Sequence, residues 1–231
     1  MAPRRRLVKS EPERQATGGR GGAGATSLSD RAFERVRGLI VDRKLASGEL
    51  LVEGQLAGQL GLTRTPLREA LVRLEGAGFL VKRMNRSFAV RQVSLAEFFQ
   101  SLKVRQYLES NAARLAAGRV LTRDIRSFRQ RIKSLARTDD HLPAHWILDD
   151  DLHNWLSAAG GNDVLADAVK RLRITTQLFE IGCPFQRTRA DAEEHLAILD
   201  ALEAGDGKAA AAVLKHLENI ELDVMRIVRG P

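Results

Sequence analysis

The sequence has a single cysteine, Cys183, and few aromatic residues, which make up 5% of its 231 positions. A lone cysteine cannot form a disulfide within the chain, which fits the reducing environment of the cytoplasm. No apolar run approaches the length of a membrane-spanning helix, and no hydrophobic segment follows the basic N-terminus as a secretory signal would require. We therefore expect a cytoplasmic protein without a membrane-spanning helix.

Basic residues outnumber acidic ones, with 37 Lys and Arg against 29 Asp and Glu and a formal net charge of +8. This excess favours a polyanion as partner, either nucleic acid or an acidic membrane surface. A basic surface without any partner would have the same composition. The length permits two modest domains, and the abundance of Ala and Leu favours helices.

The first 26 residues are rich in Arg, Gly, Ser and Pro and contain almost no large apolar side chains. Burial cannot offset the entropy of ordering such a segment, so we expect residues 1–26 to form a disordered basic arm. Its arginines could touch DNA phosphates, but a solvated tail is the preferred interpretation, since short basic tails are common.

Residues 27–93 predict three helices followed by a β-hairpin. The helices should begin near Ser27 or Ser29, after Gly48, and near Thr63 or Thr65. Two β-prone runs, 79–83 and 88–91, flank an Asn-containing turn and predict the hairpin.

Residues 94–231 show helical patterns alone, interrupted at short intervals by Gly, Pro and capping residues such as Thr122. Six helices with short connections form a bundle. The predicted fold class is therefore mainly α: an N-terminal winged helix-turn-helix followed by an all-helical six-helix bundle.

The third predicted helix has the features of a DNA-recognition helix. One apolar stripe follows the i, i+3, i+4, i+7 spacing and should face the core: Leu67, Ala70, Leu71 and Leu74. Arg64 and Arg68, four residues apart, then share the opposite face. Arginine can make bidentate contacts to guanine in the major groove, so both are candidate DNA-binding residues.

Four further residues are candidates for contacts to DNA. Thr63 and Thr65 lie at the exposed start of the helix, where hydroxyl and backbone N–H groups reach phosphates. Arg83 and Arg86 on the hairpin could reach the DNA backbone or the minor groove. A small helical domain with a solvated basic face is the alternative interpretation.

Residues 56–71, which read LAGQLGLTRTPLREAL, resemble the helix-turn-helix of GntR-family regulators, which typically reads LAxxLGVSRTPVREAL. Residues 45–51 also resemble the family's approach to its second helix. The resemblance implies that Thr63, Arg64, Thr65 and Arg68 contact operator DNA and that the wing tip enters the minor groove.

The sequence departs from the family pattern at two places. Gly54 stands where some members carry a DNA-contacting Arg, so we expect that contact to be absent. The wing tip often reads Asn-Arg-Gly, whereas here it is Asn85-Arg86-Ser87. Serine lacks the freedom of glycine at positive φ, so we expect a different turn.

Three histidines and one aspartate fall on predicted core-facing stripes of three helices: Asp149, His153, His195 and His216. A buried aspartate is costly unless it is paired or bound to a metal. Imidazole and carboxylate groups suit zinc, nickel, iron or manganese. The alternative is a set of satisfied core histidines with a local Asp–His hydrogen bond.

The C-terminal half resembles the FCD effector domain of FadR-like GntR regulators, and its six helices resemble the VanR-like subgroup. The motifs that carry this resemblance are Arg105-x-x-x-Glu109, Asp149-x-x-x-His153, residues 159–162, Glu194-His195, and Gly205-Asp206 followed by His216.

The resemblance implies a divalent metal, such as zinc, nickel or manganese, held by Asp149, His153, His195 and His216. It also implies that Arg105 meets the carboxylate of a small effector. His145 and Asp150 compete as metal ligands, since both lie on the helix that carries Asp149 and His153. A helix-surface pair with Glu109 is the alternative role for Arg105.

These observations predict a homodimeric DNA-binding repressor, or less often an activator, with a metal and a carboxylate effector. Dimers are expected because helix-turn-helix proteins read palindromic half-sites. The expected partners are double-stranded operator DNA and a second copy of the chain, with no membrane. A helical metal-dependent hydrolase is one alternative. A regulator whose metal is purely structural, or absent, is another.

Overall fold

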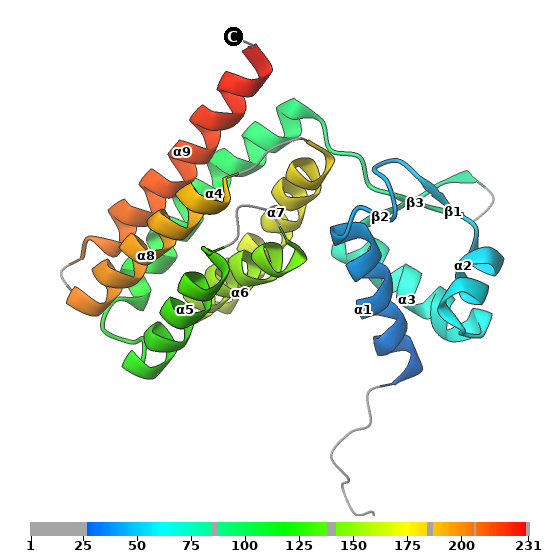
Figure 1. The fold of residues 1–231 in the computed structure, drawn as a ribbon, viewed down its shortest axis with the longest axis horizontal. Coiled ribbons are helices and arrows are strands. Elements are labelled where there is room, and N and C mark those ends of the chain that lie inside the picture. Colours follow the sequence, from blue (N-terminus) through cyan, green and yellow to red (C-terminus); the bar gives the residue numbers. More distant parts are fainter. Residues whose placement is uncertain (1–26, 85–86, 138–141, 184–186, 206, 230–231) are drawn as a thin grey trace, which may run out of the picture.

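The computed structural model describes residues 27–84, 87–137, 142–183, 187–205 and 207–229. The predicted disordered arm and the wing-tip residues Asn85 and Arg86 lie outside the described residues. Figure 1 shows a small N-terminal unit of helices and strands beside a larger bundle of long helices. The predicted fold class, mainly α with a winged helix-turn-helix before a helical bundle, is confirmed.

The N-terminal unit contains helices α1 (Leu28–Val41), α2 (Glu53–Leu60) and α3 (Arg64–Ala77). A capping box starts α1: the Ser27 hydroxyl accepts from the Asp30 N–H, and the Asp30 carboxylate accepts from the Ser27 N–H. Gly61 ends α2 at φ +60°, a left-handed conformation that favours glycine. The tight turn it makes brings α3 directly after α2.

A three-stranded antiparallel sheet completes this unit, in the order β1-β3-β2. Strands β2 (Leu80–Lys82) and β3 (Phe88–Val90) form the predicted hairpin, in which Leu80 lies opposite Val90. Strand β1 (Leu50–Leu51) pairs with β3 and was not predicted, because two residues are too few to show alternation.

Ser87 follows the wing tip without adopting positive φ. Its hydroxyl donates a hydrogen bond to the Met84 carbonyl oxygen at 2.9 Å. The serine therefore stabilises the turn through its side chain, where a glycine would rely on backbone freedom.

The bundle consists, among the described residues, of six helices: α4 (Leu95–Ala116), α5 (Thr122–Leu135), α6 (Pro143–Ala159), α7 (Asp163–Gly182), α8 (Thr188–Ala204) and α9 (Ala209–Arg229). Thr122 was predicted as the cap of α5, but the N-cap is Leu121. The Leu121 carbonyl oxygen accepts from the Asp124 and Ile125 N–H groups, so Thr122 is already inside the helix. No helix in the described ranges is long and apolar enough to cross a membrane.

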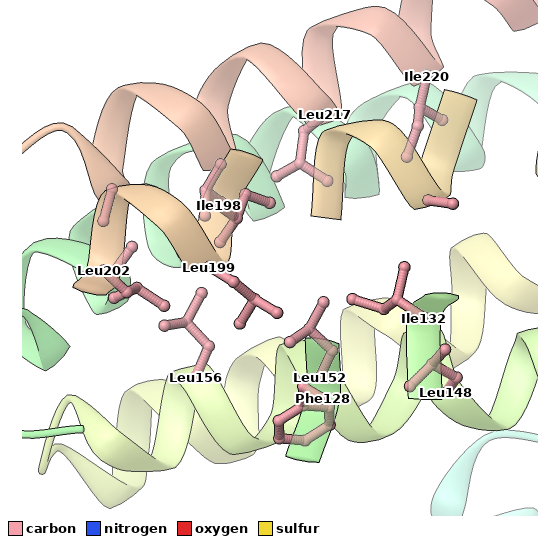
Figure 2. Packing of buried hydrophobic residues seen from close by; sticks show 14 of the residues in the cluster. Phe128, Ile132, Leu148, Leu152, Leu156, Ile198, Leu199, Leu202, Leu217 and Ile220 are labelled. Carbon is pink, nitrogen blue, oxygen red and sulfur yellow. The ribbon is translucent and has the colours of Figure 1, made fainter. Parts of the chain in front are cut away.

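Apolar side chains from five helices, α4, α5, α6, α8 and α9, fill the core of the bundle. In Figure 2, Ile132 of α5 and Leu152 of α6 point toward Leu199 of α8 and Leu217 of α9. All four are nearly inaccessible to solvent. This core holds the three helices that carry the predicted metal ligands at fixed separations.

Helix α7 belongs to both units. Ile174 and Leu178 pack into the core of the N-terminal unit, against residues of α1, α3 and the sheet. The opposite face of α7 lines a cavity in the bundle with Arg173, Thr176 and Glu180. In Figure 1, α7 lies on the side of the bundle that faces the N-terminal unit.

We expect Leu178→Ala to lower the free energy of unfolding by about 2–5 kcal/mol, because it leaves a void where the two units meet. Chemical denaturation measures the change. Val164→Ala on the same helix is the control, since Val164 is 81% exposed and its truncation should cost no more than about 0.5 kcal/mol. Equal stability of both variants would mean that α7 does not hold the two units together.

Candidate functional site

One face of α3 is exposed and basic at its N-terminal end. Thr63, Arg64, Thr65 and Arg68 are exposed, whereas Leu67 on the opposite side is fully buried. The Thr63 side chain makes no capping hydrogen bond, so its hydroxyl is available to a ligand. This face offers hydroxyl, guanidinium and helix N-terminal N–H groups together, which suits phosphate and base contacts.

Helix α2 supports the two arginines. A Cβ placed on Gly54 would lie 3.4 Å from Arg64 Nη2, so the glycine leaves room for the guanidinium. Arg68 Nη1 lies 3.8 Å from Glu53 Oε2, a loose and exposed ion pair that costs little to break. Arg83 is exposed on the wing, and Arg86 lies outside the described residues.

The four predicted metal ligands gather in the bundle. Asp149 and His153 come from α6, His195 from α8 and His216 from α9, and one ligand atom of each lies within 4.8 Å of the others. Asp149 Oδ1 is 3.3 Å from His195 Nε2 and 3.6 Å from His153 Nε2. The three imidazoles are buried, but the Asp149 side chain is 31% exposed. The helical spacing of the apolar residues predicted that Asp149 lies in the core. In the structure, Asp149 lies where the cluster opens onto the cavity.

Carboxylates behind the histidines orient two of the rings. His153 Nδ1 lies 2.5 Å from Glu109 Oε2, and His216 Nδ1 lies 2.7 Å from Glu194 Oε2. Burial opposes ionisation of Glu109, but Arg105 and His153 outweigh it and hold the pKa of Glu109 well below its usual range. An ionised carboxylate accepts a hydrogen bond from Nδ1–H, so each Nε2 presents a lone pair to the cluster.

The His216 ring is the strongest indication of a metal. Burial lowers the pKa of His216 to about 3, so the ring is neutral near pH 7. Its Nε2 atom is buried and has no hydrogen-bond partner among the described residues. A buried polar atom without a partner is unusual. A satisfied-core interpretation does not account for it, whereas a cation at the cluster does.

The two competing ligands lie outside the cluster. His145 Nε2 is 3.2 Å from the Leu135 carbonyl oxygen, and its Nδ1 is 3.0 Å from the Leu142 nitrogen. Asp150 Oδ1 lies 3.3 Å from Arg173 Nε. Both side chains thus have partners of their own, and neither belongs to the group of four whose ligand atoms lie close together.

A cavity of about 50 Å³ lies beside the cluster, and Asp149 and His195 line it. Its charged lining residues are Arg105, Asp149, Arg173, Glu180, Arg187 and Asp191. Burial raises the pKa of Glu180 to about 7, and nearby Asp149 adds to the rise. Burial alone would raise the pKa of Asp149 too, but Arg173 and the hydrogen bond from His195 hold it well below its usual range.

Arg105 pairs with Glu109, but the pair is buried inside the bundle and does not lie on a helix surface. Its guanidinium is 3% exposed and donates to Glu109 Oε1 at 2.5 Å and to Thr176 Oγ1 at 2.7 Å. The alternative of a helix-surface pair is therefore wrong, because both side chains are buried and contact Thr176 of α7 and His153 of α6. Arg105 lines the cavity, as a residue that meets an effector must.

Sequence reasoning missed two further residues of the site. Arg173 donates from Nη2 to Asp149 Oδ2 at 2.7 Å, and its Nη1 is buried without a partner among the described residues. Glu180 lies two turns further along α7 and also lines the cavity. A spacing of seven residues on one helix was visible in the sequence, but no pattern indicated that this face of α7 borders a cavity.

Two family models match the chain. The description "Bacterial regulatory proteins, gntR family" matches residues 28–90, and "FCD domain" matches residues 100–219. The second match alone spans more than half of the chain. The chain belongs to the GntR family and carries an FCD domain.

Relatives agree with this assignment. The Nta operon transcriptional regulator of Aminobacter aminovorans is 31% identical over 185 residues, which cover 79% of this chain and 88% of the relative. The HTH-type transcriptional repressor RspR of Escherichia coli K12 is 25% identical, over 87% of this chain and 90% of RspR. The solved structure of E. coli McbR/YncC shares the fold, with a TM-score of 0.74, 20% identity, and coverage of 87% of this chain and 99% of that one.

The chain is a DNA-binding transcriptional regulator and not an enzyme, because the families and relatives that it matches are regulators. The hydrolase alternative is therefore wrong. FCD domains often bind metals, and the cluster of Asp149, His153, His195 and His216 could hold one.

We expect Arg64→Ala and Arg68→Ala to weaken operator binding by about 1–3 kcal/mol each where the arginine contacts a base bidentately. Titration of DNA from the region upstream of the chain's own gene measures the loss, at two salt concentrations because phosphate contacts make binding salt-sensitive. Arg189→Ala in α8 is the control, since that side chain is 91% exposed and remote from α3. Unchanged affinity in both α3 variants would remove α3 as the recognition helix.

We expect the purified protein to hold roughly one divalent metal per chain after incubation with zinc, nickel or manganese. His195→Ala and His216→Ala should lose it, and Glu194→Gln should weaken its affinity about 10–100-fold because the His216 ring loses its orienting carboxylate. Elemental analysis after dialysis is the measurement. His145→Ala should keep the metal, and a wild-type protein that takes up none of the three metals would favour the satisfied-core interpretation.

Proposed function

We propose that the chain is a homodimeric repressor whose affinity for operator DNA is set by a divalent metal and a small carboxylate effector. The DNA-binding part would be residues 27–93 and the effector-binding part residues 94–231. The observation that carries the proposal is the gathering of Asp149, His153, His195 and His216 beside a cavity whose wall, α7, also packs into the DNA-binding unit.

A carboxylate effector suits this cavity for an electrostatic reason. A carboxylate that leaves water must have its charge met, or the transfer is expensive. A metal held by the four ligands would supply positive charge on one side. The Arg105 guanidinium would supply N–H donors on another, since its Nη2 atom has no hydrogen-bond partner among the residues described.

Repression is favoured over activation by the relative RspR, which is described as a transcriptional repressor. A homodimer is favoured because helix-turn-helix proteins bind paired half-sites. Val104 and Tyr107 on α4 support it, since both are exposed apolar side chains on one helix of the FCD domain. An effector in the cavity would then change the relative placement of the two recognition helices through α7.

We expect Arg105→Ala to weaken the response of DNA binding to a carboxylate effector while metal content stays unchanged. Arg105→Lys should restore the response only in part, because lysine lacks the planar guanidinium that binds a carboxylate with two hydrogen bonds. Calorimetry and thermal-shift screening of small carboxylates against the metal-loaded protein measure binding, and operator titration measures the response.

Removal of Arg105 also leaves Glu109 buried with His153 as its remaining partner, so the variant needs a control for stability. Arg129→Ala breaks an ion pair to Asp200 at 2.7 Å on the exterior of the bundle and should leave effector binding unchanged. A neutral or cationic effector, or a wild-type response in folded Arg105→Ala, would contradict the role proposed for Arg105.

A further inference from the structure

Besides Arg105 Nη2, two groups in the cavity lack a partner among the described residues. One is the Glu180 carboxylate, which no hydrogen bond or ion pair from these residues reaches. The other is Arg173 Nη1, a buried N–H donor on a side chain that is 3% exposed. On α7 the cavity therefore presents one free acceptor, Glu180, and one free donor, Arg173 Nη1, to whatever fills it.

The arginines of the cavity do not balance Glu180, because each is already paired. Arg105 pairs with Glu109, at 2.5 Å. The remaining pairs are Arg173 with Asp149 and Asp150, and Arg187 with Asp191, Glu194 and Asp223. The cavity is thus lined by three guanidinium groups and three carboxylates, and of these carboxylates Glu180 alone has no partner among the described residues.

A plain carboxylate effector would leave Glu180 without a partner. The metal and Arg105 would meet the effector's negative charge, but nothing on it would pair with Glu180, which borders the same small space. A cationic group on the same effector would pair with Glu180 and favour its ionised form, in a site of low dielectric where such pairing is strongest. The two unpartnered groups therefore call for an effector with an acceptor at one end and a charged donor at the other.

Helix geometry brings these two groups toward the same ligand. Arg173 and Glu180 are seven residues apart on α7, so they share one face. Thr176 and Gln177 lie between them and also line the cavity.

This step rests on the proposed carboxylate effector and narrows its chemical class. We propose that the effector is a small amino carboxylate whose ammonium group pairs with Glu180, while an acceptor oxygen of the effector takes the free N–H of Arg173. The cavity volume, about 50 Å³, favours small members of this class. Glu180 is then the residue that selects an amine over a hydroxyl or a hydrogen at the same position.

The test uses matched acids that differ in one substituent, with the full-length protein loaded with zinc. One set is alanine, lactate and propionate, and a second is aspartate, malate and succinate. In calorimetry the amino member of at least one set should bind at least about tenfold more tightly than its hydroxy and unsubstituted counterparts. Glu180→Gln should abolish that preference, because the amide is isosteric but uncharged.

Glu193→Gln is the matched control, since it removes one negative charge from a 70% exposed side chain of α8. It should keep the preference for the amine. Zinc content and melting temperature are measured for each variant, so that a loss of binding is not mistaken for a loss of metal or of fold.

Four outcomes would overturn the inference. If carboxylates bind with no preference for the amine, the effector class is wrong but the proposed function survives. If no acid in either set binds, the carboxylate effector itself is wrong. If the preference persists in Glu180→Gln, another group recognises the amine. If Glu180→Gln loses zinc, Glu180 belongs to the metal site instead.

Discussion

The arrangement of the molecule depends on α7 being packed on both sides. Ile174 and Leu178 fill part of the core beneath the recognition helix, and Arg173 and Glu180 border the cavity of the FCD domain. Cores are close-packed and respond to displacement by repacking rather than by continuous deformation. A ligand that moves one face of α7 must therefore disturb the other, without any separate structure to transmit the change.

Buried arginines explain how the FCD domain tolerates so many interior carboxylates. An ionised Glu109 or Glu194 is costly to bury alone, but Arg105 and Arg187 pair with them directly. These carboxylates in turn orient the rings of His153 and His216. The cluster thus belongs to a network in which two of its histidines are each held by an acid, and each of those two acids by an arginine.

The sequence was sufficient for the parts that depend on local pattern. The apolar stripe through Leu67 and Leu74 placed Arg64 and Arg68 on an exposed face, because helical periodicity alone decides which side is buried. The same periodicity, with a resemblance to FCD domains, selected Asp149, His153, His195 and His216. It overestimated the burial of Asp149, since periodicity identifies a face of a helix but not the point where that face meets a cavity.

The parts that depend on packing between helices could not be predicted. Glu194 orients His216 across two helices, and Arg173 meets Asp149 from α7, so neither partner is visible in the spacing along one helix. Arg105 and Glu109 are four residues apart, which predicted their pairing but not their depth. The burial of these two side chains depends on the helices that pack against α4, and the sequence of α4 alone does not show which helices those are.

Arg91 shows how closely the two units are joined. It follows strand β3, and its Nη1 donates to Thr175 Oγ1 of α7 at 3.1 Å and to the carbonyl oxygen of Gly78, which ends α3, at 3.4 Å. Its Nη2 also pairs with Glu97 in the first turn of α4. One guanidinium therefore holds the end of the recognition helix, the wall of the cavity and the start of the bundle together. Since these three bonds share one planar group, a shift of α7 that keeps the bond to Thr175 would move or break the contact at Gly78, where α3 ends.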